Sequence, residues 1–369
     1  MDTDTVVIRA GTADLIAVAF YRIGYRPRES VVTVGLVGPR HRMGVVARID
    51  LPPARHRRAA VDSMLRMLRR EGHDHFAALI VSDAGPPASA GPVRLPHRAV
   101  ARELERRAGR FGLSVIDLFA VNSSRWRSYR CPDPRCCPSE GYDLEAALTG
   151  PAAARLVAEG YVLASDEEGL LVDVAPRPEP RAERPPGRVM EPPEVRPVDV
   201  GDAPVDAAEA LARWRGLLAD PSVADDVGWL VEALDDHWLR DAVLLTLVPG
   251  AGTVPEEVMA GADPAVMDKV LAAEPDAELL ERGRVLLSAV ARSAPPGQRA
   301  DALALLAWSA WFAGHGSRGR LLAKRALADS PTHRLARLVD QLLLLGVPPV
   351  WVERQRERRQ DASSGPPPY

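Results

Sequence analysis

Three cysteines, the only ones among the 369 residues, lie within seven positions of one another at Cys131, Cys136 and Cys137. Thiolates bind metal ions and act as nucleophiles, so this cluster is the first candidate in the chain for a metal-binding or catalytic role. A structural zinc site normally takes four ligands in paired short spacings, whereas two of these thiols are adjacent. His73, His75 and His97 are the candidates for a fourth ligand, and the His73-Asp-His75 segment is the preferred source. No cofactor is predicted, and zinc is the alternative that the three thiols leave open.

A redox or nucleophilic role is a second alternative for the cysteines, because neighbouring arginines lower a thiol pKa. No general base can be identified, and no signature of a known cysteine enzyme is present. A rigid loop is the simplest interpretation, since three prolines among the cysteines fix φ. Trp126 and Tyr129 are expected to lie over this loop and to add stacking area.

Carboxylates at the ends of predicted strands are the other candidates for catalysis. Asp50 and Asp83 follow strand-like runs, whereas Asp117 lies in the middle of one. Ligands of α/β proteins gather outside the carboxyl edge of the sheet, where such side chains hold magnesium or act as acid and base. Asp is also common in turns, so these positions do not require a site.

Two predicted helices carry many arginines, which suggests nucleic-acid binding as a further alternative. The candidates for binding are Arg58, Arg66, Arg69, Arg102 and Arg106, with Trp126 and Tyr129. Few aromatic residues interleave the arginines, and only two of the 47 basic residues of the chain are lysines. Arginine is therefore the default positive charge here, and a solvated surface is the preferred interpretation.

Length and composition bound the architecture. A chain of 369 residues, of which 46% are hydrophobic, is long for one core and natural for two domains. Residues 1–165 carry 24 arginines and no lysine, so chemistry that needs a lysine in this half is excluded. No membrane span or signal segment is recognised, and we expect a cytoplasmic protein.

The first part of the chain alternates β-branched runs with amphipathic segments. Strands are expected at residues 5–9, 30–36, 43–49, 76–82 and 114–121, and helices at 15–23, 55–70, 96–110 and 150–159. Gly and Pro between the second and third strands predict an antiparallel hairpin. This order predicts an α/β sandwich with a mixed sheet.

A proline-rich stretch marks the expected domain boundary. Nine prolines occur with Arg and Glu between residues 175 and 204, a composition that cannot bury a core. We therefore expect an α/β domain over 1–174, a linker over 175–204, an all-helical domain over 205–350 and a disordered tail over 351–369.

The helical domain includes a stretch that resembles one tetratricopeptide helix pair. Residues 300–333 span 34 positions, the length of that repeat, and place small or apolar residues at its usual contact points. Residues 334–345 are expected to follow as another helix. A lone repeat cannot bury its faces, so the earlier helices must pack against it.

Three segments carry a resemblance to a known family: "DLIAVAFYRIGYRPRESVVTVGL", "VVARIDLP" and "RWRSYRCPDPRCCPSEGYDL". They resemble an uncharacterised family of high-GC Gram-positive bacteria that is described only as a domain of unknown function. The likeness covers nearly the whole chain and fails in the proline linker and the tail. It implies the domain layout and a bacterial cytoplasm, but no activity, cofactor or catalytic residue.

The leading hypothesis is a non-catalytic interaction or regulatory protein whose helical domain binds an unknown protein partner. It rests on a helical half with repeat character beside a front half without a catalytic signature. The alternatives are a hydrolase-like enzyme that uses the cysteine loop or the strand-end carboxylates, and nucleic-acid binding through the arginine-rich helices.

Overall fold

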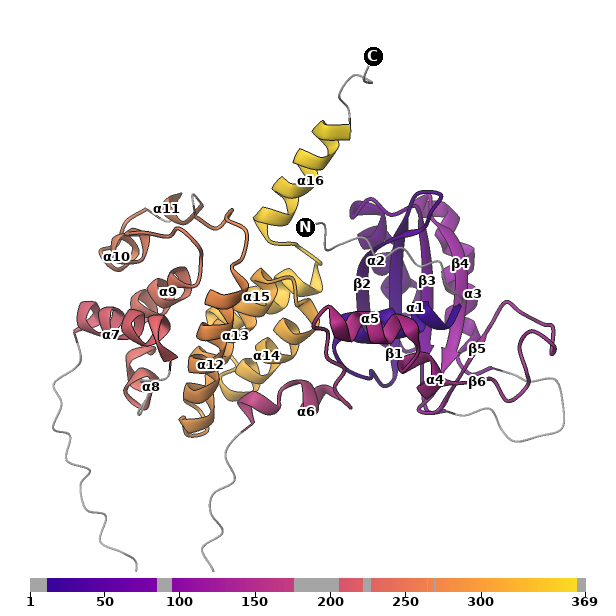
Figure 1. Cartoon of the computed structure of the whole chain (residues 1–369), viewed down its shortest axis with the longest axis horizontal. Coiled ribbons are helices and arrows are strands. Elements are labelled where there is room, and N and C mark those ends of the chain that lie inside the picture. Colours follow the sequence, from indigo (N-terminus) through magenta and orange to yellow (C-terminus); the bar gives the residue numbers. More distant parts are fainter. Residues whose placement is uncertain are drawn as a thin grey trace, which may run out of the picture. The chain divides into compact units, whose positions relative to one another are not determined.

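The chain divides into two units, Met1–Leu170 and Leu171–Tyr369, each of which is described by itself (Figure 1). The computed structural model describes residues 12–84, 95–175, 206–221, 227–263, 265–268 and 270–363. The expected strand at 5–9, residues 176–204 of the expected linker and residues 364–369 of the expected tail lie outside the described residues. The first unit is an α/β sandwich with a mixed sheet and the second is helical, as predicted.

A six-stranded sheet in the order β2-β1-β3-β4-β5-β6 forms the centre of the first unit. Its strands are β1 (Ser30–Val37), β2 (Arg42–Asp50), β3 (His75–Val81), β4 (Ser114–Val121), β5 (Arg125–Ser128) and β6 (Tyr142–Asp143). The predicted hairpin is confirmed, since β1 pairs antiparallel with β2. The β3–β4 pair is the parallel one, joined by a crossover through α3 (Arg98–Ala108).

Helices cover both faces of the sheet. On one face, α2 (Arg57–Arg70) and α3 pack on alternate residues of β3, including Phe76 and Ile80. Because successive strand residues point to opposite faces, Leu79 and Val81 need cover on the other side. The helix α1 (Thr12–Ile23) packs there against β1 and β2, together with α4 (Leu144–Leu148) and α5 (Pro151–Ala158) (Figure 1). The short elements η1 (Gly109–Phe111) and α6 (Glu167–Leu170) complete the unit.

Strands β5 and β6 and helix α4 were not predicted. The β5 sequence is short and polar, so its strand character comes from pairing with β4 and not from its own pattern. Trp126 in β5 stacks on Tyr142 in β6, with ring centroids 4.7 Å apart. This aromatic pair holds the end of the sheet together.

The second unit consists of helices in its described residues. They are η2 (Val172–Val174), α7 (Ala207–Ala219), α8 (Trp229–Ala233), α9 (His237–Thr246), α10 (Val254–Met259), α11 (Ala265–Asp268), α12 (Ala277–Ser293), α13 (Ala300–Phe312), α14 (Gly316–Asp329), α15 (Arg334–Leu344) and α16 (Val350–Ser363). Aspartate side chains accept from free backbone N–H groups at the starts of α7, α9 and α12. No helix within the described residues has both the length and the apolar character that crossing a membrane requires.

The helix α13 is the core of the second unit, because it is buried almost all round. It packs against α12, α14 and α15. The helix pair expected at residues 300–333 is confirmed as α13 and α14, and the following helix as α15. Kinship of the pair with a tetratricopeptide stays a prediction.

Two boundaries differ from the expected layout. Leu171–Val174, expected in the α/β domain, belong to the second unit, where Asp173 pairs with arginines of α12 and α14. Residues 351–363, expected to be disordered, form most of α16. Glu, Arg and Gln are good helix formers, so this segment is helical without an apolar stripe.

Candidate functional site

A pocket of about 260 Å³ opens at the edge of the sheet where the parallel strands β3 and β4 end. Phe20, Pro27, Val81 and Leu144 form its apolar lining. Its polar lining consists of Arg26, Arg28, Asp83, Asn122, Ser123 and Ser165. Apolar walls with a few convergent polar groups are typical of small-molecule sites, and the carboxyl edge of a sheet is their usual place.

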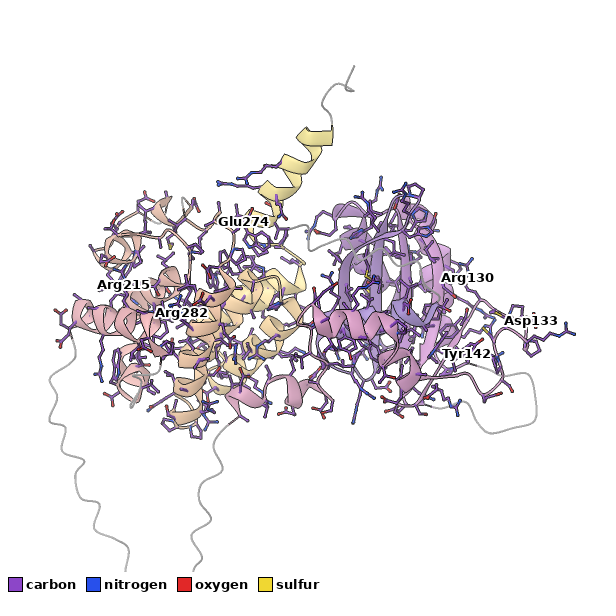
Figure 2. The ribbon with its side chains drawn as sticks, viewed as in Figure 1. Arg130, Asp133, Tyr142, Arg215, Glu274 and Arg282 are labelled. Carbon is purple, nitrogen blue, oxygen red and sulfur yellow. The ribbon has the colours of Figure 1, made fainter. Side chains whose placement is uncertain are left out.

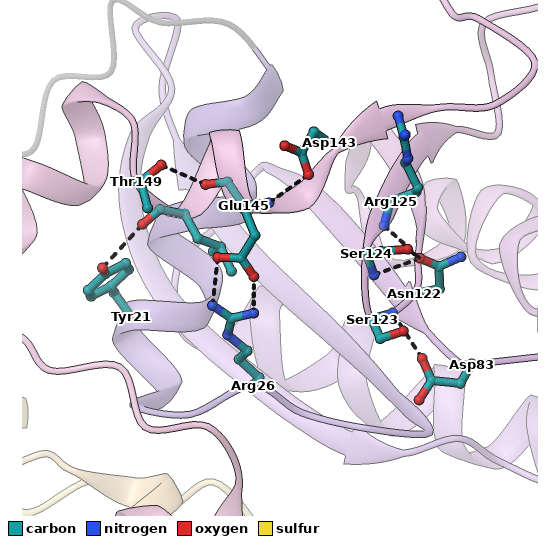
Figure 3. Close-up of polar contacts among 11 residues, drawn as sticks. Tyr21, Arg26, Asp83, Asn122, Ser123, Ser124, Arg125, Asp143, Glu145 and Thr149 are labelled. Carbon is teal, nitrogen blue, oxygen red and sulfur yellow. Dashed lines mark hydrogen bonds and ion pairs between the residues drawn. The ribbon is translucent and has the colours of Figure 1, made fainter.

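The strand-end residues are fixed by hydrogen bonds between neighbouring strands (Figure 3). Asp83 Oδ1 accepts from the N–H of Ser123 at 2.9 Å. Asn122 Oδ1 accepts from the N–H of Arg125 at 2.6 Å and of Ser124 at 2.9 Å, which closes the turn into β5. Within the described part of the chain, the second carboxylate oxygen of Asp83 makes no hydrogen bond. It is available to a ligand.

Two arginines contribute positive charge to the pocket in different ways. Arg26 is held by both carboxylate oxygens of Glu145, at 2.9 Å in one of the two contacts (Figure 3), and this hydrogen bond lowers the pKa of Glu145. Arg28 is exposed, and its guanidinium has no ion pair among the residues that the structure describes. Arg28 is therefore the cation of the pocket that can pair with a ligand.

A polar cluster lies immediately beside the pocket. Ser82 Oγ donates to Glu29 Oε1 at 2.7 Å, and His97 Nε2 lies 3.0 Å from Ser82 Oγ. The hydroxyl has one proton, so when Glu29 accepts it, His97 must be the donor in the second bond. The N–H of Ala84 also donates to Ser82 Oγ, at 3.2 Å. The Ser82 hydroxyl is thus fully engaged in fixing the end of β3.

The backbone around this cluster is strained. Glu29 and His97 are two of the three non-glycine residues with positive φ in the described chain, at 37° and 51°. Such conformations cost about 1–3 kcal/mol each and persist where the surroundings impose them. Both side chains meet at Ser82, so the strain lies at the edge of the sheet that carries the pocket.

A second hollow, of about 50 Å³, shares Asn122 with the first. Ser82, Pro96, Ala120, Trp126 and Glu140 are among its lining residues. A volume of this size has room for only a few water molecules, so the larger pocket is the better ligand site.

Of the predicted catalytic carboxylates, Asp83 lines the pocket and Asp50 does not. Asp50 lies at the same edge, at the end of the outer strand β2, where Arg48 pairs with it at 2.9 Å. Asp117 accepts from the Ser128 hydroxyl at 2.7 Å, and burial raises its pKa. The three carboxylates therefore do not converge on one point.

The three cysteines converge away from the pocket, in the loop between β5 and β6. The Sγ atoms of Cys131, Cys136 and Cys137 all lie within 4.8 Å of one another. Cys137 is buried and Cys136 is exposed. Burial raises the pKa of Cys137 to about 11, while hydrogen bonding from the Cys137 thiol lowers that of Cys131. The sequence indicated a stiff turn here, but it did not indicate that all three sulfurs meet.

The histidines proposed as a fourth metal ligand are not part of this cluster. His73 is 3% exposed and packs between β1 and β2, where its Nε2 accepts from the N–H of Val45 at 3.2 Å. His75 pairs with Asp74 at 2.8 Å and lies edge-on to His41. The structure therefore does not bring His73 or His75 to the three cysteines, and both side chains have partners at the β1–β2 end of the sheet.

The predicted arginine faces exist on α2 and α3. Arg58, Arg66, Arg69, Arg102 and Arg106 are exposed. Arg106 pairs with Glu103, and Arg66 lies over the ring of Phe111 at 5.9 Å. Acidic neighbours thus offset part of this charge, and nucleic-acid binding stays a prediction.

The two aromatic binding candidates have structural contacts. Trp126 is buried under Tyr142, as described above, and it also packs edge-on against Phe119. The Tyr129 hydroxyl donates to the carbonyl of Pro96 at 2.5 Å, and its ring packs on the α2–α3 core. Both side chains hold the sheet edge to its neighbours.

Comparison with known proteins gives a family for the chain. The family described as a domain of unknown function (DUF4192) matches residues 13–350. The chain belongs to this family. No curated protein and no solved structure matches it. For this DUF4192 chain, function must therefore be argued from the geometry of the site.

Sequence reasoning found one residue of the DUF4192 pocket, Asp83, and missed most of the others. Arg28 and Asn122 in the pocket, and Glu29 beside it, carried no motif, and His97 was not predicted to lie at this edge of the sheet. A signal was nevertheless present, since "VSDAG" and "AVNSS" place short polar residues directly after two buried strands. Parallel strands bring their carboxyl ends to one edge, so these residues had to lie close together.

Proposed function

We propose that the α/β unit of this protein binds a small organic anion at the carboxyl edge of its sheet. The observation that carries the proposal is the pocket itself, where exposed Arg28 and the unbonded oxygen of Asp83 border an apolar floor. A guanidinium pairs with a carboxylate or phosphate, and a carboxylate oxygen accepts from hydroxyl or amino groups. The favoured ligand therefore carries an anionic group and at least one hydrogen-bond donor.

The size of the pocket supports a ligand smaller than a drug molecule. Its 260 Å³ lies just below the roughly 300 Å³ at which drug-sized sites begin. Hydroxy acids, amino acids and small sugar phosphates are of suitable size and charge. The proposal is for binding and not for hydrolysis, because the nearby Ser82 hydroxyl already donates to Glu29 and is not poised as a nucleophile.

Replacement of Arg28 by alanine is expected to weaken binding at least tenfold, about 1.4 kcal/mol, because a charge-assisted pair is lost. The measurement is calorimetric titration of the full chain with hydroxy acids, amino acids and sugar phosphates, after a thermal-shift screen of these classes. Arg40→Ala is the matched control, since Arg40 is exposed in the β1–β2 turn and does not line the pocket. Equal affinity in Arg28→Ala and the unmodified protein would exclude this site.

A second proposed function concerns the helical unit, which we infer binds a protein partner. Leu338 and Leu345 are 52% and 67% exposed on and just after α15, and their spacing of seven places them on one face. Residues 171–369, which form this unit, carry 23 Lys and Arg against 30 Asp and Glu, a net charge of −7. An acidic unit with an exposed leucine face fits a partner with an apolar patch bordered by basic residues.

The double substitution Leu338→Glu and Leu345→Glu is expected to abolish capture of such a partner, because charge cannot be buried in an apolar interface without a large penalty. Chemical cross-linking in cells, followed by mass spectrometry, measures the loss. Val285→Glu, at an exposed position of α12, is the control. If the double variant retains every cross-linked partner, this leucine face is not the interface.

A further inference from the structure

The loop between β5 and β6 brings all three sulfur atoms of the chain together. The Sγ atoms of Cys131, Cys136 and Cys137 lie within 4.8 Å of one another. Two of these residues are neighbours in sequence, yet both of their sulfurs approach the third. This convergence is a property of the folded loop, so the contacts that impose it decide what the cluster can do.

A tight turn that begins at Asp133 brings Cys136 and Cys137 back to Cys131. The carbonyl of Asp133 accepts from the N–H of Cys136 at 3.2 Å and of Cys137 at 2.7 Å. Its side chain accepts from the N–H of Arg135 at 2.9 Å, which closes the turn on the other side. Prolines at 132, 134 and 138 restrict φ before, within and after it. The loop is therefore ordered by its own backbone.

Both ends of the loop are attached to the sheet. Ser128 Oγ donates to Asp117 in β4 at 2.7 Å and accepts from the N–H of Cys131 at 3.3 Å. At the other end, the Tyr142 hydroxyl donates to the carbonyl of Cys136 while its ring stacks on Trp126. Figure 2 shows Asp133 and Tyr142 at this end of the sheet. The sulfur positions are thus prepared in advance, which reduces the entropic cost of binding an ion.

We propose that Cys131, Cys136 and Cys137 bind one zinc ion through three thiolates, with water in the fourth position. Zinc–thiolate bonds of about 2.3 Å in a tetrahedron place sulfurs roughly 3.8 Å apart, so the loop needs to contract by at most about 1 Å. Cys136 is exposed, and the open position therefore faces solvent. Three thiolates suit zinc better than magnesium or calcium, which prefer oxygen ligands.

The charge around the loop supports an anionic metal centre. Three thiolates and Zn²⁺ carry a net charge of −1. Arg125 and Arg127 donate to the carbonyls of Gly141 and Ser139, at 3.4 and 3.3 Å, and so lie against the same loop. Their guanidiniums place positive charge against this loop, which offsets part of the charge of the complex.

The test uses the full chain, incubated with Zn²⁺ under reducing conditions and then freed of unbound metal. We expect one zinc per chain by elemental analysis and three thiols that react with a thiol reagent only after a chelator is added. Replacement of zinc by Co²⁺ should give a thiolate-to-cobalt charge-transfer absorption and tetrahedral d–d bands. This spectrum reports the ligands directly, in the unsubstituted protein.

Variants then assign the ligands. Each of Cys131→Ser, Cys136→Ser and Cys137→Ser is expected to weaken zinc binding at least tenfold, and the triple variant is expected to abolish it. Ser139→Ala, in the same loop, should bind as the unmodified protein does. Circular dichroism shows whether a variant is folded, and the Co²⁺ spectrum decides the proposal even when a variant is not.

Three results would overturn the proposal. The first is three reactive thiols and no bound metal after exposure to micromolar Zn²⁺. The second is zinc retained at full stoichiometry by the triple variant, which would place the ion elsewhere. The third is tight binding of Cu⁺ with no binding of Zn²⁺, which would replace zinc by a three-coordinate copper site.

Discussion

Alanine in place of Gly44 is expected to destabilise the α/β unit by about 3 kcal/mol, because the new methyl group overlaps a buried ring. A Cβ at Gly44 would lie 1.9 Å from Cε1 of His73, and one at Gly35 would lie 2.4 Å from Cδ2 of the same ring. The His73 ring occupies the space that these two glycines leave between β1 and β2. The register shifts at this point, where Gly44 and Val45 oppose Gly35 in a β-bulge.

Hydrogen exchange of the β1 and β3 peptides, followed by mass spectrometry, measures the effect in the full chain. Gly109→Ala is the matched control, because Gly109 has an ordinary φ of −61° and nothing lies near its Cβ position. The double variant Gly44→Ala/His73→Ala should be more stable than the sum of the single effects predicts, since each change makes room for the other. Equal protection in Gly44→Ala and Gly109→Ala would show that the ring does not fill this space.

His73 also illustrates which inferences the sequence supports and which it does not. A His-Asp-His sequence near a cysteine cluster is a reasonable source of metal ligands, but sequence says nothing of the distance between them. The glycines that make room for the ring are 29 and 38 residues before it in the chain. The sequence around each glycine gives no reason for a glycine at that position. The packing role of His73 could therefore not be inferred from the residues near it in the chain.

The strands and helices themselves were largely predictable. Runs such as "SVVTVGL" and "FAALIV" are β-branched or apolar throughout, and they became β1 and β3, buried on both faces. In contrast, "RWRS" and "YD" have no such pattern and form strands through their pairing partners. Local propensity thus predicted the centre of the sheet and missed its edge.

The pocket was predictable only in part, for the same reason. Asp83 follows a strand whose end could be placed from its composition. Arg28 and Glu29 precede a strand that runs antiparallel to β3, which brings its start to the same edge. His97 comes from the beginning of α3. Recognising these residues as neighbours requires the strand order β1-β3-β4, which one sequence does not supply.

Removal of the Asp173 carboxylate is expected to destabilise the helical unit by about 3 kcal/mol, because two arginines would lose their common partner. The Asp173 carboxylate accepts from Arg318 at 2.6 Å and from the Ser288 hydroxyl at 3.3 Å. It also accepts from Arg284. Its backbone carbonyl also accepts from Arg292 at 2.8 Å. These contacts attach the segment before residue 176 to α12 and α14.

The sign of the pH dependence follows from the same contacts. Burial acts to raise the pKa of Asp173, but hydrogen bonds and charge from Arg318 and Arg284 outweigh it and hold the pKa below its ordinary 3.8. A carboxylate with a lowered folded pKa stabilises fully above its unfolded pKa, and this contribution is lost as the pH falls through the folded value. The difference in unfolding free energy between the unmodified protein and Asp173→Ala should therefore be constant down to about pH 5 and shrink below pH 4.

Urea unfolding followed by tryptophan fluorescence measures this difference, because six of the seven tryptophans lie in the second unit. Trp126→Phe removes the seventh and makes the signal specific. Asp268→Ala, at an exposed position of α11 without an ion pair among the described residues, should change stability by less than about 0.5 kcal/mol. A cost of Asp173→Ala no larger than that of the control would mean that α12 and α14 do not depend on this carboxylate. A cost that does not shrink as the pH falls below 4 would instead assign the effect to packing, since an ionic contribution must decrease once the unfolded carboxylate takes up its proton.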